Sequence, residues 1–310
     1  MTSSPSKHKF MTLHQIDKKK TIAALLDLRT RYEGSDSSFA AKFDLHPSVF
    51  SQMKSGKGTD NLISDDKLVG IAMELGVSLI DAPEWKIANA VAFSEYTDLL
   101  KICQQEGASR IICDRADRGK TTAAKQYMLK NHNAFYVDCA ENKTYTLFIK
   151  ALCKSMGLPL TGTPYDRVQR IKRFLIAIKN PIVMLDEFGD LKYEAFLEMK
   201  NLWNGTECRC AWVVIGAQGL KKKLQSGMDN DRIGFSEFFR RFGTDFMTAR
   251  YTENDAEERV FFLGEATKIV AANMPKMKVS ELMAKSESTG TIYSLTRIKE
   301  RIIKMKREAA

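Results

Sequence analysis

Two short clusters of polar residues have the composition of a phosphate- and metal-binding site. Gly119-Lys120-Thr121 follows the apolar run Ile111-Ile112-Cys113 and a charged loop, and it precedes residues that favour a helix. Strand, loop, Gly-Lys-Thr and helix is the order of a P-loop, where backbone N–H groups cradle phosphates, the lysine reaches the β/γ-phosphates and the threonine binds Mg²⁺. The residues predicted to hold ATP are Ala116, Asp117, Arg118, Gly119, Lys120, Thr121 and Thr122.

The P-loop pattern is incomplete. Its usual form is G-x-x-x-x-G-K-[ST], and here the first glycine position holds Asp114. Asp114 and Asp117 place two acids in a loop that should meet a polyanion, and Arg115 and Arg118 can offset them. Because glycine reaches backbone angles that other residues avoid, its absence predicts a tightened or distorted turn. On this tripeptide alone, an ordinary strand–turn–helix is an equal alternative.

The second cluster is a pair of acids at the end of an apolar run. Ile182-Val183-Met184-Leu185 suits a buried parallel strand, and Asp186-Glu187 follows it. Asp186 is predicted to hold Mg²⁺ through water, and Glu187 to polarise the attacking water. A solvated acidic turn is the alternative for the pair taken alone. Both clusters together favour a nucleotide-hydrolysing site.

Further candidates lie downstream. Gln218 comes just after the apolar run 212–216, where ATPases of the AAA+ kind carry a polar sensor that orients the attacking water. Arg240 and Arg241 occupy the region from which an arginine finger would reach a neighbouring subunit's γ-phosphate. Arg297 is the candidate for a second sensor in a C-terminal lid. A loop glutamine and a salt-bridged arginine pair are the alternatives for the first two.

Composition limits the partners. Lys and Arg number 48 against 38 Asp and Glu, so the formal net charge is +10, which favours an anionic partner. Cys208-Arg209-Cys210 has no nearby histidine or second cysteine pair, so zinc is not predicted. Reduced thiols and the lack of a signal peptide predict a cytoplasmic protein. No apolar run approaches the ~20 residues that span a bilayer, so no membrane association is predicted.

The apolar runs predict an α/β fold. Strand candidates alternate with helical segments, and they lie at 111–113, 134–139, 182–185 and 212–216, with a further candidate at 245–249. This order predicts a doubly wound parallel sheet with helices on both faces. We predict three domains: an all-α module at 1–84, an ATPase core at 85–252 and a small helical lid at 253–310. The helices expected in the lid cover 257–273, 279–285 and 292–307.

The N-terminal module has the pattern of a helix-turn-helix. The segment 38–56 reads as two short helices joined by a tight turn near Leu45-His46, with Ser48, Ser51, Gln52 and Lys54 on the face that would meet DNA. Residues 1–85 carry eleven basic and eleven acidic side chains, which argues against strong DNA binding by this module alone. A plain helical interaction module is therefore equally favoured.

With these motifs in this order, the whole chain resembles the B transposition proteins of Mu-like transposable phages, most closely over 108–246. The wider group includes the target-selecting ATPases of related transposons. The resemblance implies an AAA+ P-loop ATPase with a helical lid that uses ATP and Mg²⁺ in the bacterial host cytoplasm. It also implies binding to double-stranded DNA with little sequence preference, assembly into a helical filament, delivery of that DNA to a DDE transposase, and hydrolysis stimulated by both.

In such filaments the loop after the second strand and the start of the connector helix face the DNA. By that resemblance the phosphate contacts would come from Lys143, Thr161, Thr163, Arg167 and Arg170. Contacts of this kind predict salt-sensitive binding that tolerates any sequence.

Two other functions fit the same motifs. One is a signalling ATPase of the STAND type, with an N-terminal interaction module and no direct contact with DNA. The other is a nucleotide-binding protein that has lost hydrolysis. Measuring duplex binding with and without ATP distinguishes the STAND-type ATPase from a DNA-binding ATPase. Measuring ATP turnover distinguishes the protein without hydrolysis from both.

Overall fold

The computed structural model describes residues 15–56, 62–77, 85–249, 254–280 and 294–308. The chain divides into two compact units, Met1–Glu84 and Trp85–Ala310. Most of the predicted helix at 279–285 falls outside the described residues. The further division of the second unit at 252/253 stays a prediction.

The N-terminal unit is helical. Its helices are α1 (Gln15–Thr30), α2 (Asp36–Lys42), α3 (Pro47–Lys54) and α4 (Asp65–Leu75). Phe39 packs its ring against Phe43 and Phe50 at centroid distances of 5.3 and 5.2 Å, which joins α2 to α3 across the turn. The α3 residues that were predicted to meet DNA, Ser48, Ser51, Gln52 and Lys54, are all exposed. DNA binding by α3 stays a prediction.

The second unit is built on a parallel sheet of five strands in the order β2-β3-β4-β1-β5. The strands are β1 (Arg110–Cys113), β2 (Ala134–Asp138), β3 (Ile182–Asp186), β4 (Ala211–Gly216) and β5 (Phe246–Met247). Every residue of β3 and β4 is buried, as expected of central strands covered on both faces. Because all strands are parallel, the ends of β1 and β3 that carry the two polar clusters lie at the same edge of the sheet.

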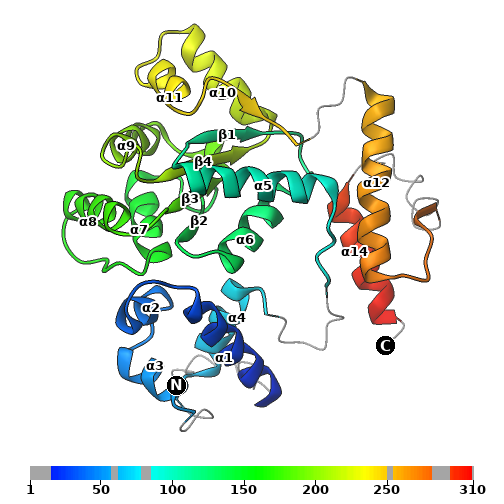
Figure 1. Cartoon of the computed structure of the whole chain (residues 1–310), viewed down its shortest axis with the longest axis horizontal. Coiled ribbons are helices and arrows are strands. Elements are labelled where there is room, and N and C mark those ends of the chain that lie inside the picture. The colour runs from blue at the N-terminus through cyan, green and yellow to red at the C-terminus, as the bar shows by residue number, and fades with distance from the viewer. Residues whose placement is uncertain (1–14, 57–61, 78–84, 250–253, 281–293, 309–310) are drawn as a thin grey trace, which may run out of the picture. The chain divides into compact units, whose positions relative to one another are not determined.

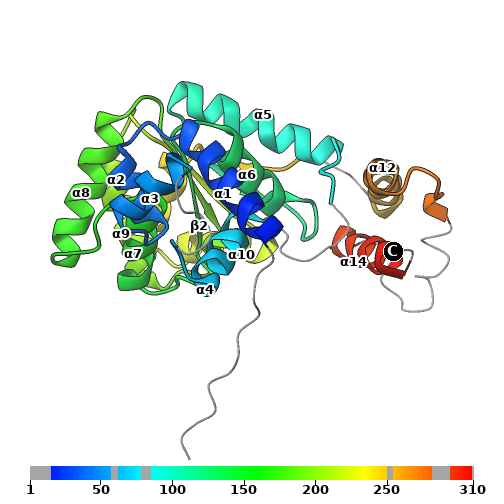
Figure 2. The same cartoon turned by 90° about the horizontal axis from the view of Figure 1, so that it is seen from below.

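Helices cover both faces of the sheet (Figures 1 and 2). One face packs against α5 (Val91–Glu106) and α6 (Lys120–Lys130). The other face packs against α7 (Tyr145–Ser155), α8 (Pro164–Ala177), α9 (Tyr193–Asn204), α10 (Gln218–Asp229) and α11 (Phe235–Arg241). Successive strand residues alternate between these two cores; for example, Ile111 enters the second core and Ile112 the first. A short 3₁₀ turn, η1 (Phe188–Asp190), follows β3.

Two C-terminal helices, α12 (Asp255–Asn273) and α14 (Leu295–Glu308), lie side by side next to the N-terminus of α5 (Figures 1 and 2). Phe262, Val270 and Ile302 form the centre of their shared apolar core. Within the described residues, no helix combines the length and apolar character that crossing a membrane requires.

Candidate phosphate-binding site

The loop between β1 and α6 adopts its turn without the first glycine of the P-loop pattern. Left-handed backbone occurs at Asp117 (φ 61°) and Gly119 (φ 82°), whereas Asp114 keeps a negative φ. Aspartate tolerates left-handed backbone better than most side chains. The distortion expected from Asp114 is therefore absent, because glycine-like angles are needed only later in the loop.

The buried carboxylate of Asp114 instead links three segments of the chain through hydrogen bonds. One carboxylate oxygen accepts hydrogen bonds from the Tyr96 hydroxyl at 2.6 Å and the Ala249 N–H at 3.0 Å. The other accepts from the Arg115 N–H at 2.6 Å and lies 3.5 Å from Arg118 Nε. Burial and this neighbouring carboxylate raise the pKa of Tyr96, so the phenol stays protonated and donates. The carboxylate joins α5, the loop after β1 and the segment after β5.

Lys120 opens α6 with its side chain buried under the loop. Its Nζ donates to the carbonyl oxygens of Asp114 at 3.1 Å and Arg115 at 2.6 Å. Burial lowers the pKa of Lys120, and the charges of Asp114, Asp186 and Glu187 oppose that shift. A lysine held in this way offers a positive charge beside the N-terminus of a helix, which is a favourable place for a phosphate.

The two acids after β3 have different environments. Asp186 is buried, and its carboxylate accepts a hydrogen bond from the Tyr136 hydroxyl at 2.9 Å and from the Glu187 N–H at 3.0 Å. Glu187 is exposed and has left-handed backbone, with φ 47° and ψ 41°. Partial burial raises the pKa of Glu187, Asp186 adds to the shift and Lys120 opposes it. One acid is thus fixed below the site, and the other reaches into it.

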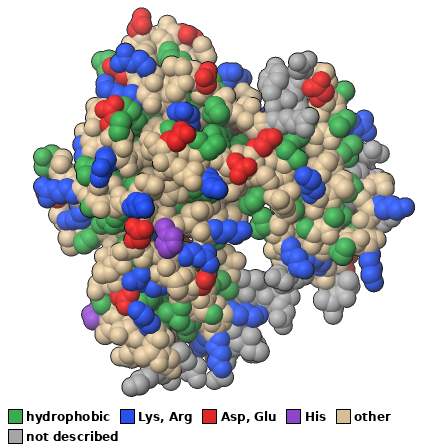
Figure 3. Space-filling view, in the orientation of Figure 1, with side chains coloured by type: hydrophobic (Ala, Val, Ile, Leu, Met, Phe, Trp, Pro, Cys, Tyr) green, Lys and Arg blue, Asp and Glu red, His purple; other side chains and the backbone are tan. Residues whose placement is uncertain are grey.

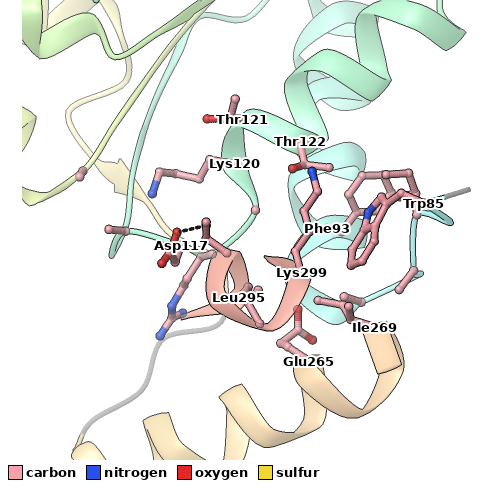
Figure 4. Close-up of a pocket in the computed structure, with 18 of the residues that line it drawn as sticks. Trp85, Phe93, Asp117, Lys120, Thr121, Thr122, Glu265, Ile269, Leu295 and Lys299 are labelled. Carbon is pink, nitrogen blue, oxygen red and sulfur yellow. Dashed lines mark hydrogen bonds between the residues drawn. The ribbon is translucent and has the colours of Figure 1, made fainter. Parts of the chain in front are cut away.

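A cavity of about 430 Å³ brings most of these groups together (Figure 4). All of the predicted loop residues 116–122 line it, and so does Glu187. Figure 4 shows Lys120 and Thr121 on the phosphate-binding side of this cavity. Its volume lies within the usual range for small-molecule sites, about 300–1,000 Å³.

The other end of the cavity is apolar and was not found by the sequence analysis. It is lined by Trp85, Ile87, Phe93 and Ile269. Lys299 extends from α14 toward Thr122, and its ammonium lies 5.5 Å from the centre of the Trp85 ring (Figure 4). These residues come from three distant segments, so no local motif marks them. A cavity with an aromatic, apolar end and a cationic end is complementary to a nucleotide, because the base is flat and apolar and the phosphates are negatively charged.

The helices α12 and α14 contact the loop through polar groups. The Asp117 carboxylate accepts from the Thr296 hydroxyl at 2.6 Å and from the Ser294 hydroxyl. Buried Arg118 pairs with Glu258 of α12 and lies 4.8 Å from the Phe261 ring centre. Glu265 accepts the backbone N–H groups of Val91 at 2.7 Å and Ala92 at 3.1 Å. Asp117, like Asp114, therefore has its carboxylate hydrogen-bonded within the protein.

Three residues predicted for the nucleotide site, Asp186, Gln218 and Arg297, are not among those that line the cavity. Gln218 is exposed as the first residue of α10, while its neighbour Ala217 lines the cavity. Arg297 is exposed on α14, and Lys299, two residues later, lines the cavity in its place. One helical residue corresponds to a rotation of about 100°, so a two-residue offset moves a side chain to another face. The role of Arg297 as a second sensor stays a prediction.

The two arginines at the end of α11 differ in their solvent exposure. Arg240 is exposed, whereas the Arg241 guanidinium lies 5.2 Å from the Trp203 ring centre with its buried Nη1 lacking a hydrogen-bond partner. Arg240 is thus available to another molecule, and Arg241 packs against its own fold.

The predicted DNA-contact residues lie in the loop before α7, in the loop before α8 and in α8 itself. Lys143 precedes α7 and is exposed. Thr163 caps α8 and shares a capping box with Asp166, whose carboxylate already occupies the Thr163 N–H at 2.8 Å. Arg167 donates to Leu160 O at 2.8 Å, and Arg170 donates to the carbonyls of Pro159 at 2.5 Å and Thr161 at 3.2 Å. Figure 3 shows Lys and Arg side chains along the edge where α8 lies in Figure 1.

The residues present fit ATP with Mg²⁺. Lys120 and the start of α6 offer donors for phosphates, Trp85 and Phe93 offer an apolar surface for a base, and Thr121 and Asp186 offer oxygen atoms for a cation. Among the described residues, no cluster of three or more His, Cys, Asp or Glu could hold a metal by itself.

Comparisons with known proteins agree at the level of the fold. Residues 106–224 match the family described as "AAA domain". No curated protein sequence matches the chain. Among solved structures, the ORC1 protein of Aeropyrum pernix in complex with DNA is similar with a TM-score of 0.51 and 13% identity, over 75% of this chain and 64% of that chain. This chain therefore spans less than two thirds of that protein's length.

The predicted fold class is confirmed: the chain has an α/β fold with a five-stranded parallel sheet, residues 106–224 match an AAA domain, and the fold is similar to that of an ORC1 protein. The narrower resemblance to B transposition proteins stays a prediction, because the comparisons reach only the AAA level.

Proposed function

We propose that the chain binds and hydrolyses ATP with Mg²⁺ and uses the ATP-bound state to hold double-stranded DNA. The observation that carries this proposal is the single cavity with Lys120 and Thr121 at one end and Trp85 and Phe93 at the other, with Glu187 beside the phosphate end. The match of 106–224 to the AAA domain supports it independently.

Each part of the chemistry has a candidate group. Mg²⁺, when bound, neutralises phosphate charge, and Thr121 and Asp186 are the residues that would hold it. Lys120 binds phosphate, and Glu187 accepts a proton from the attacking water. A raised pKa makes Glu187 a stronger base than an ordinary carboxylate while leaving it an acid that can be ionised near neutral pH.

Three observations support DNA binding. The formal charge of the chain is +10, Arg167 and Arg170 of α8 donate to carbonyl oxygens of the loop before that helix, and the similar ORC1 structure was solved with DNA. Phosphate contacts from such groups predict binding that tolerates any sequence. The resemblance to B transposition proteins extends the proposal to filaments on DNA and to a DDE transposase as the recipient of that DNA.

The test is retention of mixed-sequence duplex DNA on a filter with and without ATP, at low and moderate salt. We expect retention only with ATP and a steep loss as salt rises. Lys120→Ala should abolish ATP binding and hence DNA retention. Lys130→Ala, which removes an exposed lysine from the last turn of the same helix, should retain both.

Failure of the parent protein to retain duplex in either state would contradict the DNA role and favour a STAND-type signalling ATPase. Retention of ATP by Lys120→Ala at the parent's affinity would contradict the assignment of the phosphate site itself.

A further inference from the structure

The turn that follows Glu187 is held from two sides. On one side, Lys223 of α10 donates from its Nζ to the carbonyl oxygens of Gly189 at 2.6 Å and Leu191 at 2.7 Å. On the other side, Lys143 forms an ion pair with Asp190, with 2.8 Å between Nζ and Oδ2. Glu187 thus begins a turn whose position depends on two lysines from different elements.

The Asp190 side of the turn is connected directly to Glu187. The Asp190 N–H donates to the Glu187 carbonyl at 2.9 Å, and Glu187 itself has left-handed backbone. The Lys192 N–H donates to the Lys143 carbonyl at 2.8 Å, so the loop before α7 is also joined to the turn through its backbone. A change at the Lys143–Asp190 pair therefore has a short path to the acid.

The two lysines differ in their exposure to competitors. Lys223 is half-buried and donates to backbone carbonyls, and burial lowers its pKa. The side chains of Lys143 and Asp190 are 50% and 43% exposed. An exposed pair of this kind shifts an equilibrium by at most about fivefold, so an incoming phosphate can replace Asp190 as the partner of Lys143.

We propose that the Lys143–Asp190 ion pair is a DNA-responsive restraint on Glu187. Without DNA, Asp190 holds Lys143, and the restrained turn prevents Glu187, which already lines the cavity, from moving into its hydrolytic position. A DNA phosphate that takes over Lys143 releases Asp190, and the turn is then anchored by Lys223 alone. This inference rests on the proposed function and on the DNA contact that the resemblance to B transposition proteins implies for Lys143.

The two single variants give opposite results in DNA binding and the same result in hydrolysis. Asp190→Asn frees Lys143, so duplex affinity should rise, and the DNA-independent ATPase rate should rise by up to about fivefold. Lys143→Gln should raise that rate similarly but weaken duplex binding. In both variants the ratio of DNA-stimulated to DNA-independent rate should fall. Lys150→Gln in α7 and Glu194→Gln in α9 remove exposed charges nearby and should keep the parent's ratio.

A charge exchange separates this restraint from a merely structural contact. Lys143→Glu with Asp190→Lys rebuilds an ion pair of reversed polarity, so the low DNA-independent rate should return. The DNA response should stay lost, because an acid at position 143 repels phosphate. Recovery of the DNA response in the exchanged protein would overturn the inference.

The remaining outcomes are also decisive. If duplex stimulates the parent and Asp190→Asn keeps the parent's stimulation ratio, the restraint does not exist although the proposed function stands. If the parent neither binds duplex nor responds to it, the proposed function fails and the restraint fails with it.

Discussion

Glu187 combines an unusual backbone conformation with an unfavourable charge. Partial burial and the neighbouring Asp186 raise its pKa, and left-handed backbone is uncommon for a glutamate. A carboxyl with a raised folded-state pKa stabilises the fold below its unfolded pKa, and this contribution is lost as pH rises through the folded pKa. At neutral pH, the ionised Glu187 therefore lowers the stability of the protein.

Glu187→Gln should accordingly raise the melting temperature at pH 7 while lowering ATP turnover by about 10²–10⁴-fold. The thermal gain should shrink as pH falls below the ordinary range of a glutamate, because the parent carboxyl is then protonated too. Thermal melts between pH 4 and 8, beside steady-state ATPase assays and ATP-binding measurements, test both effects, and we expect ATP to stay bound. A variant that hydrolyses ATP like the parent would remove Glu187 from the reaction.

At the scale of elements, Asp114 links the end of β1 to α5 and to the segment after β5. Its carboxylate accepts hydrogen bonds from Tyr96 and Ala249 and lies beside Arg118, all in a buried setting. Asp114→Asn removes the charge and replaces an acceptor with a donor, so partners are left buried and unsatisfied. We expect a loss of about 3 kcal/mol in the free energy of unfolding.

Urea denaturation followed by tryptophan fluorescence measures that loss. Asp117→Asn is the matched control, because the Asp117 carboxylate is exposed and accepts hydrogen bonds from two hydroxyl groups, those of Ser294 and Thr296. Its effect on unfolding should be clearly smaller. Equal losses for the two variants would show that Asp114 is no more important to the fold than a surface acid.

At the scale of the whole molecule, the exposed Arg240 concerns assembly. A guanidinium supplied by one copy to the ATP of another would leave each isolated copy with an incomplete site. We expect Arg240→Ala to lower ATPase activity by about 10³-fold or more. Arg241→Ala should retain activity and lose some thermal stability, because Arg241 packs over Trp203.

Mixing two inactive proteins tests whether Arg240 acts between copies. Arg240→Ala carries an intact Lys120, and Lys120→Ala carries an intact Arg240, so a mixed assembly contains complete sites. ATPase activity should therefore reappear on mixing. Persistent inactivity of the mixture, with both variants folded, would count against a finger supplied in trans.

Much of the fold follows from local sequence. Apolar runs bounded by polar residues fall at all of β1 to β4, and the strand candidate at 245–249 contains β5. The P-loop was found because Gly119, Lys120 and Thr121 are adjacent, and the loop's need for left-handed backbone is local. Helix ends were predicted less accurately; the helix expected at 257–273 spans Asp255–Asn273, since the Asn254 side chain caps it by accepting a hydrogen bond from the Glu257 N–H.

The sequence by itself determined the order of strands and helices, the phosphate-binding loop and the acids after β3, because these depend on residues close together in the chain. Only the tertiary structure decided which distant residues complete the site. The cavity also contains Trp85, Ile269 and Lys299, because α12 and α14 pack beside α5. The hydrogen bonds of Asp114 form because three separate segments of the chain converge at its carboxylate. These contacts depend on how helices and strands pack together, so the spacing of residues along the sequence does not reveal them.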